Sequence, residues 1–241
     1  MVQETKPKAG KKVLIIDDDV LLVRLIEHNL SRIEVKVIKA YTGYEGISLV
    51  RTQQPDLVIL DIILPDIDGW DVLQRIRQVS KVPILMLTVK ESEEDIVQAL
   101  NHGADDYCTK PVGMAELTAR VQAIFRRAEL YQSREQVEFA DHLLRINLAE
   151  QRVFKEGKEI RLTPTEFNLV HYLLTRAGRF IRPREILSQV WGQEYVDDVD
   201  LLRTCIWQLR RKLEPNPAQP RYIINRPGFG YMFNRRSPNQ N

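Results

Sequence analysis

Cysteine is scarce in this chain of 241 residues, and long apolar runs are missing. The two cysteines, Cys108 and Cys205, lie far apart and outside any CxxC or histidine-rich spacing, which argues against a disulfide framework and against a zinc site. No stretch approaches the roughly 20 apolar residues that a membrane-spanning helix requires. The charged first segment is followed by an apolar run too short for a signal peptide. We therefore expect a protein of the cytoplasm that neither crosses a membrane nor is secreted.

A strong net charge is also missing, since the formal value is only +2. The charge is unevenly distributed, with 17 basic and 19 acidic residues in 1–128 against 18 and 14 in 129–241. Within 199–241, eight basic residues stand against two acids. Such asymmetry is typical of a surface that binds a polyanion such as nucleic acid, although a solvated basic face fits the count equally well. The length is that of two domains of ordinary size.

The first half alternates apolar runs of strand length with segments of helical period. Strands are predicted at 13–17, 35–40, 56–61, 83–88 and 106–110, and helices at 20–31, 43–52, 69–79, 92–102 and 113–128. Strands that are apolar along nearly their whole length belong to a parallel sheet buried on both faces. We predict a doubly wound α/β domain of five β/α units around a five-stranded parallel sheet over 11–128, followed by a linker over 129–136.

The second half opens with short strand-like pieces and a turn signal at Gly157, which indicates a small antiparallel sheet. Thr163, Pro164 and Glu166 form a capping-box pattern for a helix that runs to about 176. Further helices are predicted at 183–191 and 198–213, and RYIINRPGFGYMF places two strands around a glycine-rich turn. Three helices and a hairpin predict an α+β winged-helix domain over 137–236.

Polar side chains follow several of the predicted parallel strands. In an open parallel sheet the carboxyl ends of the strands form the ligand site, so these residues should converge. Crowded carboxylates repel one another unless a cation compensates them, and an oxygen-preferring ion such as Mg²⁺ fits best. The converging residues are Asp17, Asp18, Asp61, Thr88 and Lys110.

Asp61 is the best candidate nucleophile of this group. It ends the most apolar strand and precedes a loop that contains Pro65 and Gly69. A carboxylate beside Mg²⁺ and a lysine can accept a phosphoryl group, because phosphoryl transfer depends mainly on positioning and charge neutralisation. Neighbouring acids are better interpreted as helix caps or solvated loop residues; these are Asp19, Asp66 and Asp68.

Four segments, IIDDD, DLVILDIILPDIDGW, LMLTVK and DDYCTKP, resemble the signature segments of response-regulator receivers and cover 11–128. The resemblance implies that Asp61 accepts a phosphoryl group from a phosphohistidine of a sensor histidine kinase, and that Lys110 contacts the phosphoryl oxygens. It also implies a switch in which Thr88 and Tyr107 move. The implied Mg²⁺ ligands are Asp17, Asp18, Asp61 and the backbone carbonyl of Ile63.

The resemblance further implies a homodimer, formed on phosphorylation through the fourth helix, fifth strand and fifth helix. The residues that match intersubunit salt bridges of the family are Asp105, Asp106, Arg120 and Arg127. Ile96 and Gln122 stand where basic partners are common, and Val89 and Val112 also depart from the family pattern. One hypothesis is that Val89 restricts the access of water to Asp61 and slows hydrolysis; an unchanged rate in Val89→Ala would contradict it.

The helix predicted at 198–213 has an apolar side for the core and a donor-rich side. The apolar side holds Val199, Leu202, Ile206, Leu209 and Leu213. The other side suits phosphates and base edges in a major groove, and it carries Arg203, Thr204, Trp207, Gln208 and Arg211, with Arg210 at its border. The alternative is an exposed charged helix whose Trp207 packs against the hairpin.

RLTPTEFNLVHYLL, FIRPREILSQVW and the hairpin segment resemble the OmpR/PhoB-type effector domain over 137–236. The resemblance implies binding to double-stranded promoter DNA, with Arg226 of the wing at the minor groove or a phosphate. The loop 192–197 is a candidate contact for RNA polymerase. Cys205, Trp207 and Gln208 stand where the family commonly has Arg or His, and Pro227 lies in the wing turn.

These features together predict a phosphorylation-controlled transcription regulator, not an enzyme. One alternative is a DNA-binding regulator that is independent of phosphorylation, supported by the incomplete dimer face. Another is a phosphatase of the haloacid dehalogenase type, suggested by DIDG at 66–69. In those enzymes the first aspartate closes a strand, whereas here the strand closes at Asp61 and Asp66 follows Pro65 in a loop.

Overall fold

The computed structural model describes residues 10–88, 103–130 and 137–235. Contacts along the chain divide it into two compact units, Met1–Lys90 with Tyr107–Thr118 and Glu91–Asp106 with Ala119–Asn241. Among the described residues, no helix combines the length and the apolar character that a membrane crossing requires. The helix predicted at 92–102 lies outside the described residues.

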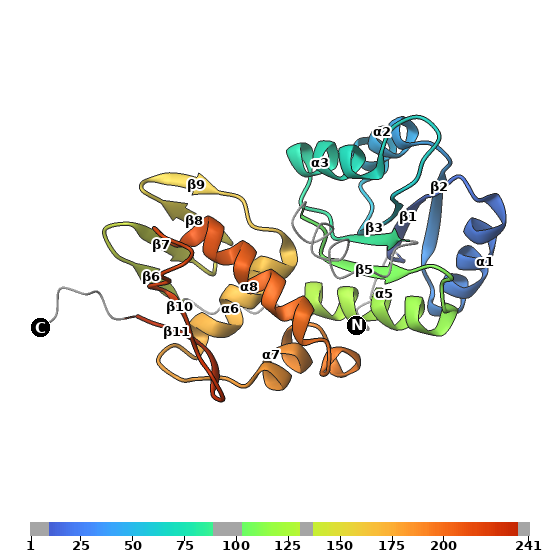
Figure 1. Ribbon diagram of the computed structural model, residues 1–241. Coiled ribbons are helices and arrows are strands. Elements are labelled where there is room, and N and C mark those ends of the chain that lie inside the picture. The colour runs from blue at the N-terminus through green and yellow to red at the C-terminus, as the bar shows by residue number, and fades with distance from the viewer. Residues whose placement is uncertain (1–9, 89–102, 131–136, 236–241) are drawn as a thin grey trace, which may run out of the picture. The chain divides into compact units, whose positions relative to one another are not determined.

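A five-stranded sheet forms the centre of the first half of the chain (Figure 1). Its strands are β1 (Lys12–Ile16), β2 (Lys36–Ala40), β3 (Leu57–Asp61), β4 (Ile84–Thr88) and β5 (Asp106–Thr109). The order is β2-β1-β3-β4-β5, and β1 pairs in parallel with both β2 and β3. The chain therefore reverses its direction of winding between β1 and β3, which makes the carboxyl ends of these two strands the natural ligand site.

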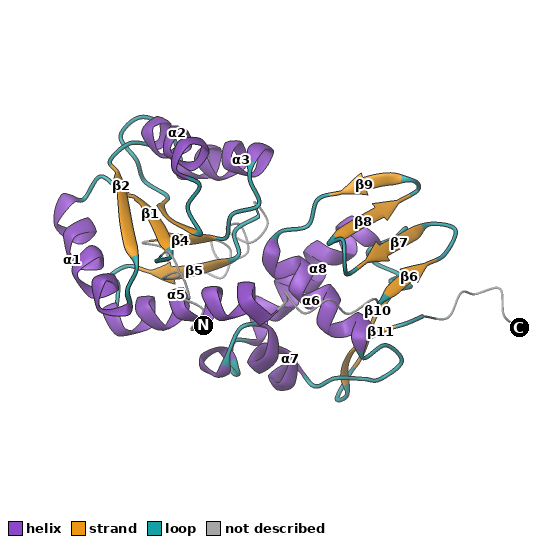
Figure 2. Ribbon diagram, turned by 180° about the vertical axis from the view of Figure 1, so that it is seen from behind, coloured by secondary structure: helices purple, strands orange, loops and turns teal. Residues whose placement is uncertain are grey.

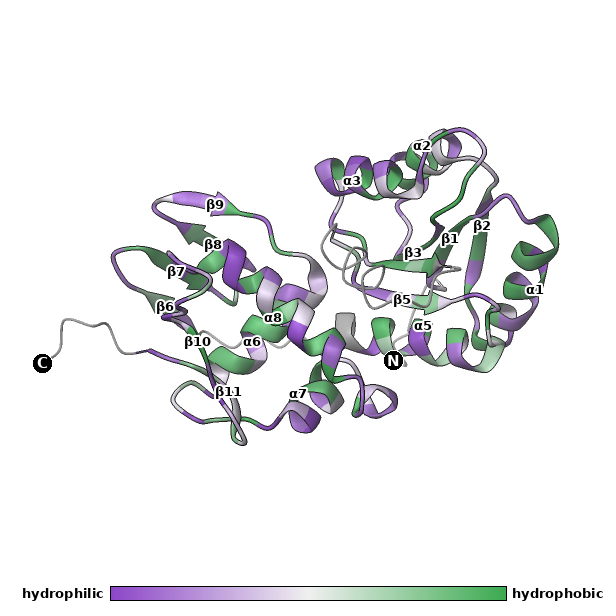
Figure 3. Cartoon of the chain, viewed as in Figure 1, coloured by the Kyte–Doolittle hydropathy of each residue, from purple (hydrophilic) through white to green (hydrophobic). Residues whose placement is uncertain are grey.

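The helices of this half are α1 (Val20–Leu30), α2 (Gly43–Gln53), α3 (Gly69–Val79) and α5 (Met114–Leu130). Helices α2 and α3 lie side by side on one face of the sheet and α1 on the other (Figures 1 and 2). Burial on both faces explains why every residue of β3 is buried and why the central strands are hydrophobic in Figure 3. The predicted α/β architecture is confirmed.

Short polar side chains define where the helices begin. The Asp19 carboxylate accepts hydrogen bonds from the backbone N–H groups of Leu21 and Leu22 at the start of α1. Asp68 caps α3 in the same way through the N–H of Trp70. Both acids satisfy N–H groups that a helix leaves unpaired at its first turn, so their interpretation as helix caps is confirmed.

The second half begins with a four-stranded antiparallel sheet. Its strands are β6 (Glu138–Ala140), β7 (Leu144–Asn147), β8 (Arg152–Lys155) and β9 (Lys158–Ile160). The turn between β8 and β9 places Glu156 and Gly157 at positive φ, as the glycine at this position predicts. Three helices follow, α6 (Pro164–Thr175), α7 (Pro183–Val190) and α8 (Val199–Leu213), and then a hairpin of β10 (Ile223–Arg226) and β11 (Gly230–Phe233). The predicted capping box of Thr163 and Glu166 is present.

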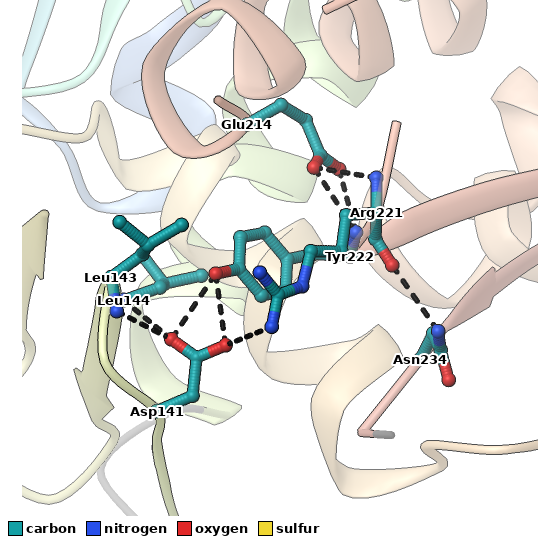
Figure 4. A network of polar contacts seen from close by, with 7 residues as sticks. All are labelled: Asp141, Leu143, Leu144, Glu214, Arg221, Tyr222 and Asn234. Carbon is teal, nitrogen blue, oxygen red and sulfur yellow. Dashed lines mark hydrogen bonds and ion pairs between the residues drawn. The ribbon is translucent and has the colours of Figure 1, made fainter. Parts of the chain in front are cut away.

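A buried polar network fixes the hairpin to the end of α8 and to the four-stranded sheet (Figure 4). Glu214, which is 1% exposed, accepts backbone N–H bonds from Arg221, Tyr222 and Ile223. The Tyr222 hydroxyl donates to the Asp141 carboxylate in the turn between β6 and β7. Burial and the neighbouring Asp141 carboxylate both raise the pKa of Tyr222, so its hydroxyl keeps its proton and donates.

Candidate functional site

An acidic pocket lies where the topology predicts, at the carboxyl ends of β1 and β3. Carboxylate oxygens of Asp17, Asp18 and Asp61 all lie within 4.8 Å of one another. Asp17 is fully buried and Asp61 is 5% exposed, whereas Asp18 is open to solvent. The Lys110 Nζ lies 2.9 Å from Asp17 Oδ2 and 2.9 Å from Asp61 Oδ2. The structure thus brings together four of the five residues expected to converge.

The charges of this pocket do not balance. Burial raises the pKa of Asp61, the hydrogen bond and charge of Lys110 act in the opposite direction, and the net shift is upward. Burial lowers the pKa of Lys110, but bonds to Asp61 and Asp17 outweigh it, so the lysine remains protonated. Three carboxylates against one lysine leave a negative pocket lined by oxygen ligands. That donor set fits a hard divalent cation such as Mg²⁺.

The loop after β3 folds tightly back against the strand end. A Cβ on Gly69 would lie 2.3 Å from the Asp61 carbonyl oxygen, and the Gly69 N–H donates to the Ile62 carbonyl at 2.8 Å. Only glycine permits this approach without moving backbone. Ile63, whose backbone carbonyl is a predicted Mg²⁺ ligand, lies two residues after the end of β3, and its side chain is 62% exposed.

Asp66, in the same loop, binds the start of α2 and is not part of the acidic pocket. Its carboxylate accepts hydrogen bonds from the N–H groups of Gly43 and Tyr44 at 2.8 and 2.9 Å, which ties the loop to the start of α2. Burial alone would raise the pKa of Asp66, but these backbone bonds lower it overall. Because Asp66 and Asp68 are both used at helix starts, the DIDG segment has no feature of a phosphatase nucleophile. The sequence predicted the capping roles but not the connection to α2.

The predicted switch and dimer residues fall in different places. Tyr107 is partly buried in β5, and Thr88 ends β4, but the side chain of Thr88 lies outside the described part of the structure. The side chain of Arg127 and residues Val89 and Ile96 lie outside it as well. The remaining members of the set are Asp105, which is 1% exposed, Asp106, which is fully buried, Arg120 and the exposed Gln122.

Asp106 is paired within its own chain. The Arg120 Nη1 donates to Asp106 Oδ1 at 3.0 Å, and the Arg120 side chain is only 14% exposed. The family resemblance predicts that both residues form salt bridges with a second subunit. Within the single chain the opposite charges of β5 and α5 already meet, and the role of these residues in a dimer stays a prediction.

Helix α8 has the predicted apolar side, since Leu202, Ile206, Leu209 and Leu213 are all buried. The opposite side is narrower than predicted. Arg203, Trp207 and Arg211 are exposed, whereas Thr204 and Gln208 are only 8% and 6% exposed.

The assignment of Thr204 and Gln208 to an exposed DNA face therefore does not match this structure. Helix α8 packs against both α6 and α7. Gln208 lines a small cavity with Thr163, Thr165 and Trp191. Arg210 at the border donates from Nε and Nη2 to the Ile223 carbonyl, so it supports the hairpin.

The exposed part of α8 is built around an aromatic–arginine pair. The Arg211 guanidinium carbon lies 4.8 Å from the centre of the Trp207 ring, and Trp207 is 47% exposed. The alternative in which Trp207 packs against the hairpin stays untested, but about half of the side chain is open to solvent. Arg226, at the end of β10, is also exposed. The chain thus presents guanidinium groups from two elements to solvent, as a polyanion-binding surface requires.

Comparisons with known proteins agree with both halves of this description. Residues 13–122 match the family "Response regulator receiver domain", and residues 157–233 match "Transcriptional regulatory protein, C terminal". The chain is 39% identical to the transcriptional regulatory protein KdpE of Mycobacterium tuberculosis over 221 residues, which cover 92% of this chain and 98% of that protein. It is 40% identical to the DNA-binding dual master transcriptional regulator RpaA of Synechocystis over 232 residues, 92% of this chain and 94% of the relative.

One solved structure is similar to this chain over nearly the full length of both proteins. The response regulator DrrB of Thermotoga maritima, an OmpR/PhoB homologue, shares 27% identity, and the match covers 93% of this chain and 99% of DrrB with a TM-score of 0.50.

Proposed function

Because this chain belongs to the response regulators that combine a receiver with an OmpR/PhoB-type effector domain, we propose that phosphorylation of Asp61 controls its binding to promoter DNA. The observation that carries the proposal is the position of Lys110, 2.9 Å from both Asp61 and Asp17 in a cluster of three acids. We assign the receiver to 11–128, the linker to 129–136 and the winged-helix domain to 137–236. The protein acts in the cytoplasm.

In the proposed reaction, a carboxylate oxygen of Asp61 attacks the phosphorus of a phosphohistidine on a sensor histidine kinase. A new P–O bond forms while the P–N bond to the histidine breaks, and the histidine ring recovers its electron pair. Lys110 is close enough to move from the carboxylates to a phosphoryl oxygen. Mg²⁺ would supply further neutralisation of charge, held by Asp17, Asp18, Asp61 and the carbonyl of Ile63.

The phosphoryl group is proposed to shift a population that already exists, through Thr88 and Tyr107. The active form is a homodimer that uses Asp105, Asp106, Arg120 and Arg127. Because Asp106 already pairs with Arg120 in the same chain, this bond opens or is shared when a second subunit contributes its own charges.

The dimer places two effector domains on half-sites about one helical turn apart. Helix α8 enters the major groove, with Arg203, Trp207 and Arg211 as its exposed contacts. Thr204, Gln208 and Arg210 contribute by supporting the helix and hairpin. Arg226 reaches the minor groove, and the loop 192–197 is proposed to contact RNA polymerase.

The same Asp106–Arg120 pair favours a second candidate function, in which DNA binding does not depend on phosphorylation. If charges of the dimer face already pair within one chain, phosphorylation changes the free energy of dimerisation less. Neither candidate is an enzyme with a turnover of its own on small substrates.

Selection of binding sites from a random duplex pool tests both candidates. The full chain is compared with Asp61→Ala, each with and without a small phosphoryl donor and Mg²⁺. Tighter, dimeric binding that requires Asp61 supports the first candidate. Equal binding in all four arms supports the second, and the absence of selected sequences contradicts the assignment of the effector domain.

A further inference from the structure

The tip of the β10–β11 hairpin carries an exposed phenylalanine that the proposed function does not use. Phe229 is 52% exposed, which is unusual for a large aromatic side chain on a rigid turn. The guanidinium carbon of Arg226 lies 4.3 Å from the centre of its ring. A cation at this distance from an aromatic face is held by the ring quadrupole, so the two side chains form one unit.

The backbone of the tip fixes this unit in place. The Phe229 N–H donates to the Arg226 carbonyl at 3.0 Å, with Pro227 and Gly228 between them and Gly228 at φ +79°. Proline at the second position and glycine with positive φ at the third are the pattern of a type II turn. Arg226 and Phe229 are therefore the first and last residues of a stiff turn and cannot separate far.

The start of β11, directly after the tip, is equally constrained. Tyr231 and Ile181 exchange two backbone hydrogen bonds of 2.8 and 3.0 Å. Gly230 passes so close that a Cβ there would lie 2.0 Å from the Ile181 carbonyl oxygen. Phe180, next to Ile181, lies with its ring centre 6.3 Å from that of Phe229 at an angle of 58°. A second aromatic ring thus lies next to the ring that contacts Arg226.

We propose that Phe229 is a positioning residue for recognition of A·T-rich minor grooves: its ring holds the Arg226 guanidinium at the wing tip, ready to enter the groove. This inference rests on the proposed DNA-binding function. A narrow A·T minor groove attracts an arginine through its negative potential and offers acceptors only, whereas a G·C pair adds an amino group. An arginine fixed in advance loses less conformational freedom on binding than a free one.

The chain offers a matched control in Phe154, far from the wing in β8. Arg145 and Arg152 each place a guanidinium carbon 4.8 Å from the Phe154 ring centre. Phe154→Leu therefore removes an arginine–aromatic contact from the same domain without touching the hairpin. Phe229→Leu removes the corresponding contact at the tip, and Phe229→Trp retains it, since tryptophan is the strongest partner for a cation.

The experiment measures the affinity of the full chain for a selected duplex, using Phe229→Leu, Arg226→Gln and the double variant. We expect Phe229→Leu to weaken binding roughly three- to five-fold, as expected for an exposed cation–aromatic pair. The double variant should bind within two-fold of Arg226→Gln alone, because Phe229 acts through Arg226. Phe229→Trp and Phe154→Leu should bind as the unmodified chain does.

Substitution of base pairs that flank the binding site in the selected duplex gives an independent readout of minor-groove recognition. Replacing flanking A·T pairs by I·C keeps the minor-groove acceptors, whereas G·C adds the amino group. We expect binding to tolerate I·C and to weaken with G·C, and Phe229→Leu to reduce this difference. Multiplicative losses in the double variant, an equal loss in Phe154→Leu, or indifference to G·C would each overturn the inference. If the unmodified chain selects no duplex, the proposed DNA-binding function itself fails; if it binds a selected duplex and Arg211→Ala weakens binding but Phe229→Leu does not, only this inference fails.

Discussion

The acidic pocket and the proposed DNA-binding surface hold their charges in opposite ways. In the pocket, Asp17 and Asp61 are nearly inaccessible, and the strand ends that carry them fix their positions. On the effector domain, Arg211 and Arg226 extend into solvent, and each lies over a neighbouring aromatic ring. Charges at the buried site are therefore positioned by the fold itself, whereas those at the surface are positioned by individual side chains. The first arrangement suits a reaction at one buried place, whereas the second presents each guanidinium group to a ligand in solution.

The sharpest test of the pocket removes one carboxylate at a time. We expect Asp61→Asn to abolish phosphoryl incorporation from a small phosphoryl donor with Mg²⁺, because the amide is not a nucleophile of this kind. Incorporation is measured by the mobility of the full chain in a phosphate-binding gel. Asp19→Asn is the matched control, since asparagine caps α1 as well as aspartate does and the residue lies in the same acidic run. Incorporation that persists in Asp61→Asn would place the acceptor elsewhere.

The close approach of the loop to β3 predicts the next largest effect, on stability. In Gly69→Ala the new Cβ would meet the backbone at Asp61 and Ile62, which cannot move as a side chain can. We expect the free energy of unfolding to fall by about 3 kcal/mol, the upper end for overpacking. Urea unfolding of the full chain measures it. Gly113→Ala, whose Cβ would meet nothing closer than 3.7 Å, should change stability by less than about 1 kcal/mol.

The sheet and most of the acidic pocket could be predicted from the sequence. The apolar runs and the acids at their ends predicted the parallel sheet and the meeting of Asp17, Asp61 and Lys110, because parallel strands must align their carboxyl ends. The capping pattern at Thr163 likewise determined where α6 begins. These features depend on rules that operate along the chain or within one sheet.

The details that the sequence missed depend on packing between distant elements. Thr204 and Gln208 lie on the polar side of a helical projection, yet both are buried, and this burial depends on elements that are distant in the sequence. Nor did the sequence show that Asp106 and Arg120 pair within one chain. The role of Glu214 as acceptor for three backbone N–H groups has no signal in the sequence, since it depends on the path of residues 221–223.

The revised face of α8 predicts unequal effects on DNA binding. Arg211→Ala should weaken binding by about ten-fold and reduce the dependence of log Kd on log salt by about one unit, as the loss of one phosphate contact does. Thr204→Val should change affinity less than two-fold, because that side chain is buried. Titration of a selected duplex at several salt concentrations measures both. Equal losses in the two variants would show that α8 meets DNA with the wider face first expected.

The smallest effect concerns Asp141, which joins the four-stranded sheet to the β10–β11 hairpin. Burial acts to raise its pKa, but backbone bonds from Leu144 and Leu143, the Tyr222 hydroxyl and the charge of Arg221 lower it overall. A carboxyl with a lowered folded pKa contributes stability above its unfolded pKa, near 3.9, and loses that contribution as the pH falls through the folded value. We expect Asp141→Asn to cost about 1 kcal/mol at neutral pH and progressively less below about pH 4.

Urea unfolding of the full chain between neutral and acid pH, followed by tryptophan fluorescence, measures this difference. Asp200→Asn is the control, because Asp200 pairs with Arg203 at 2.8 Å on the surface, where both side chains are more than 60% exposed. Such a pair contributes little, so its removal should leave the curve unchanged. A cost in Asp141→Asn that stayed constant down to acid pH would mean that the side chain acts through its shape and hydrogen bonds alone.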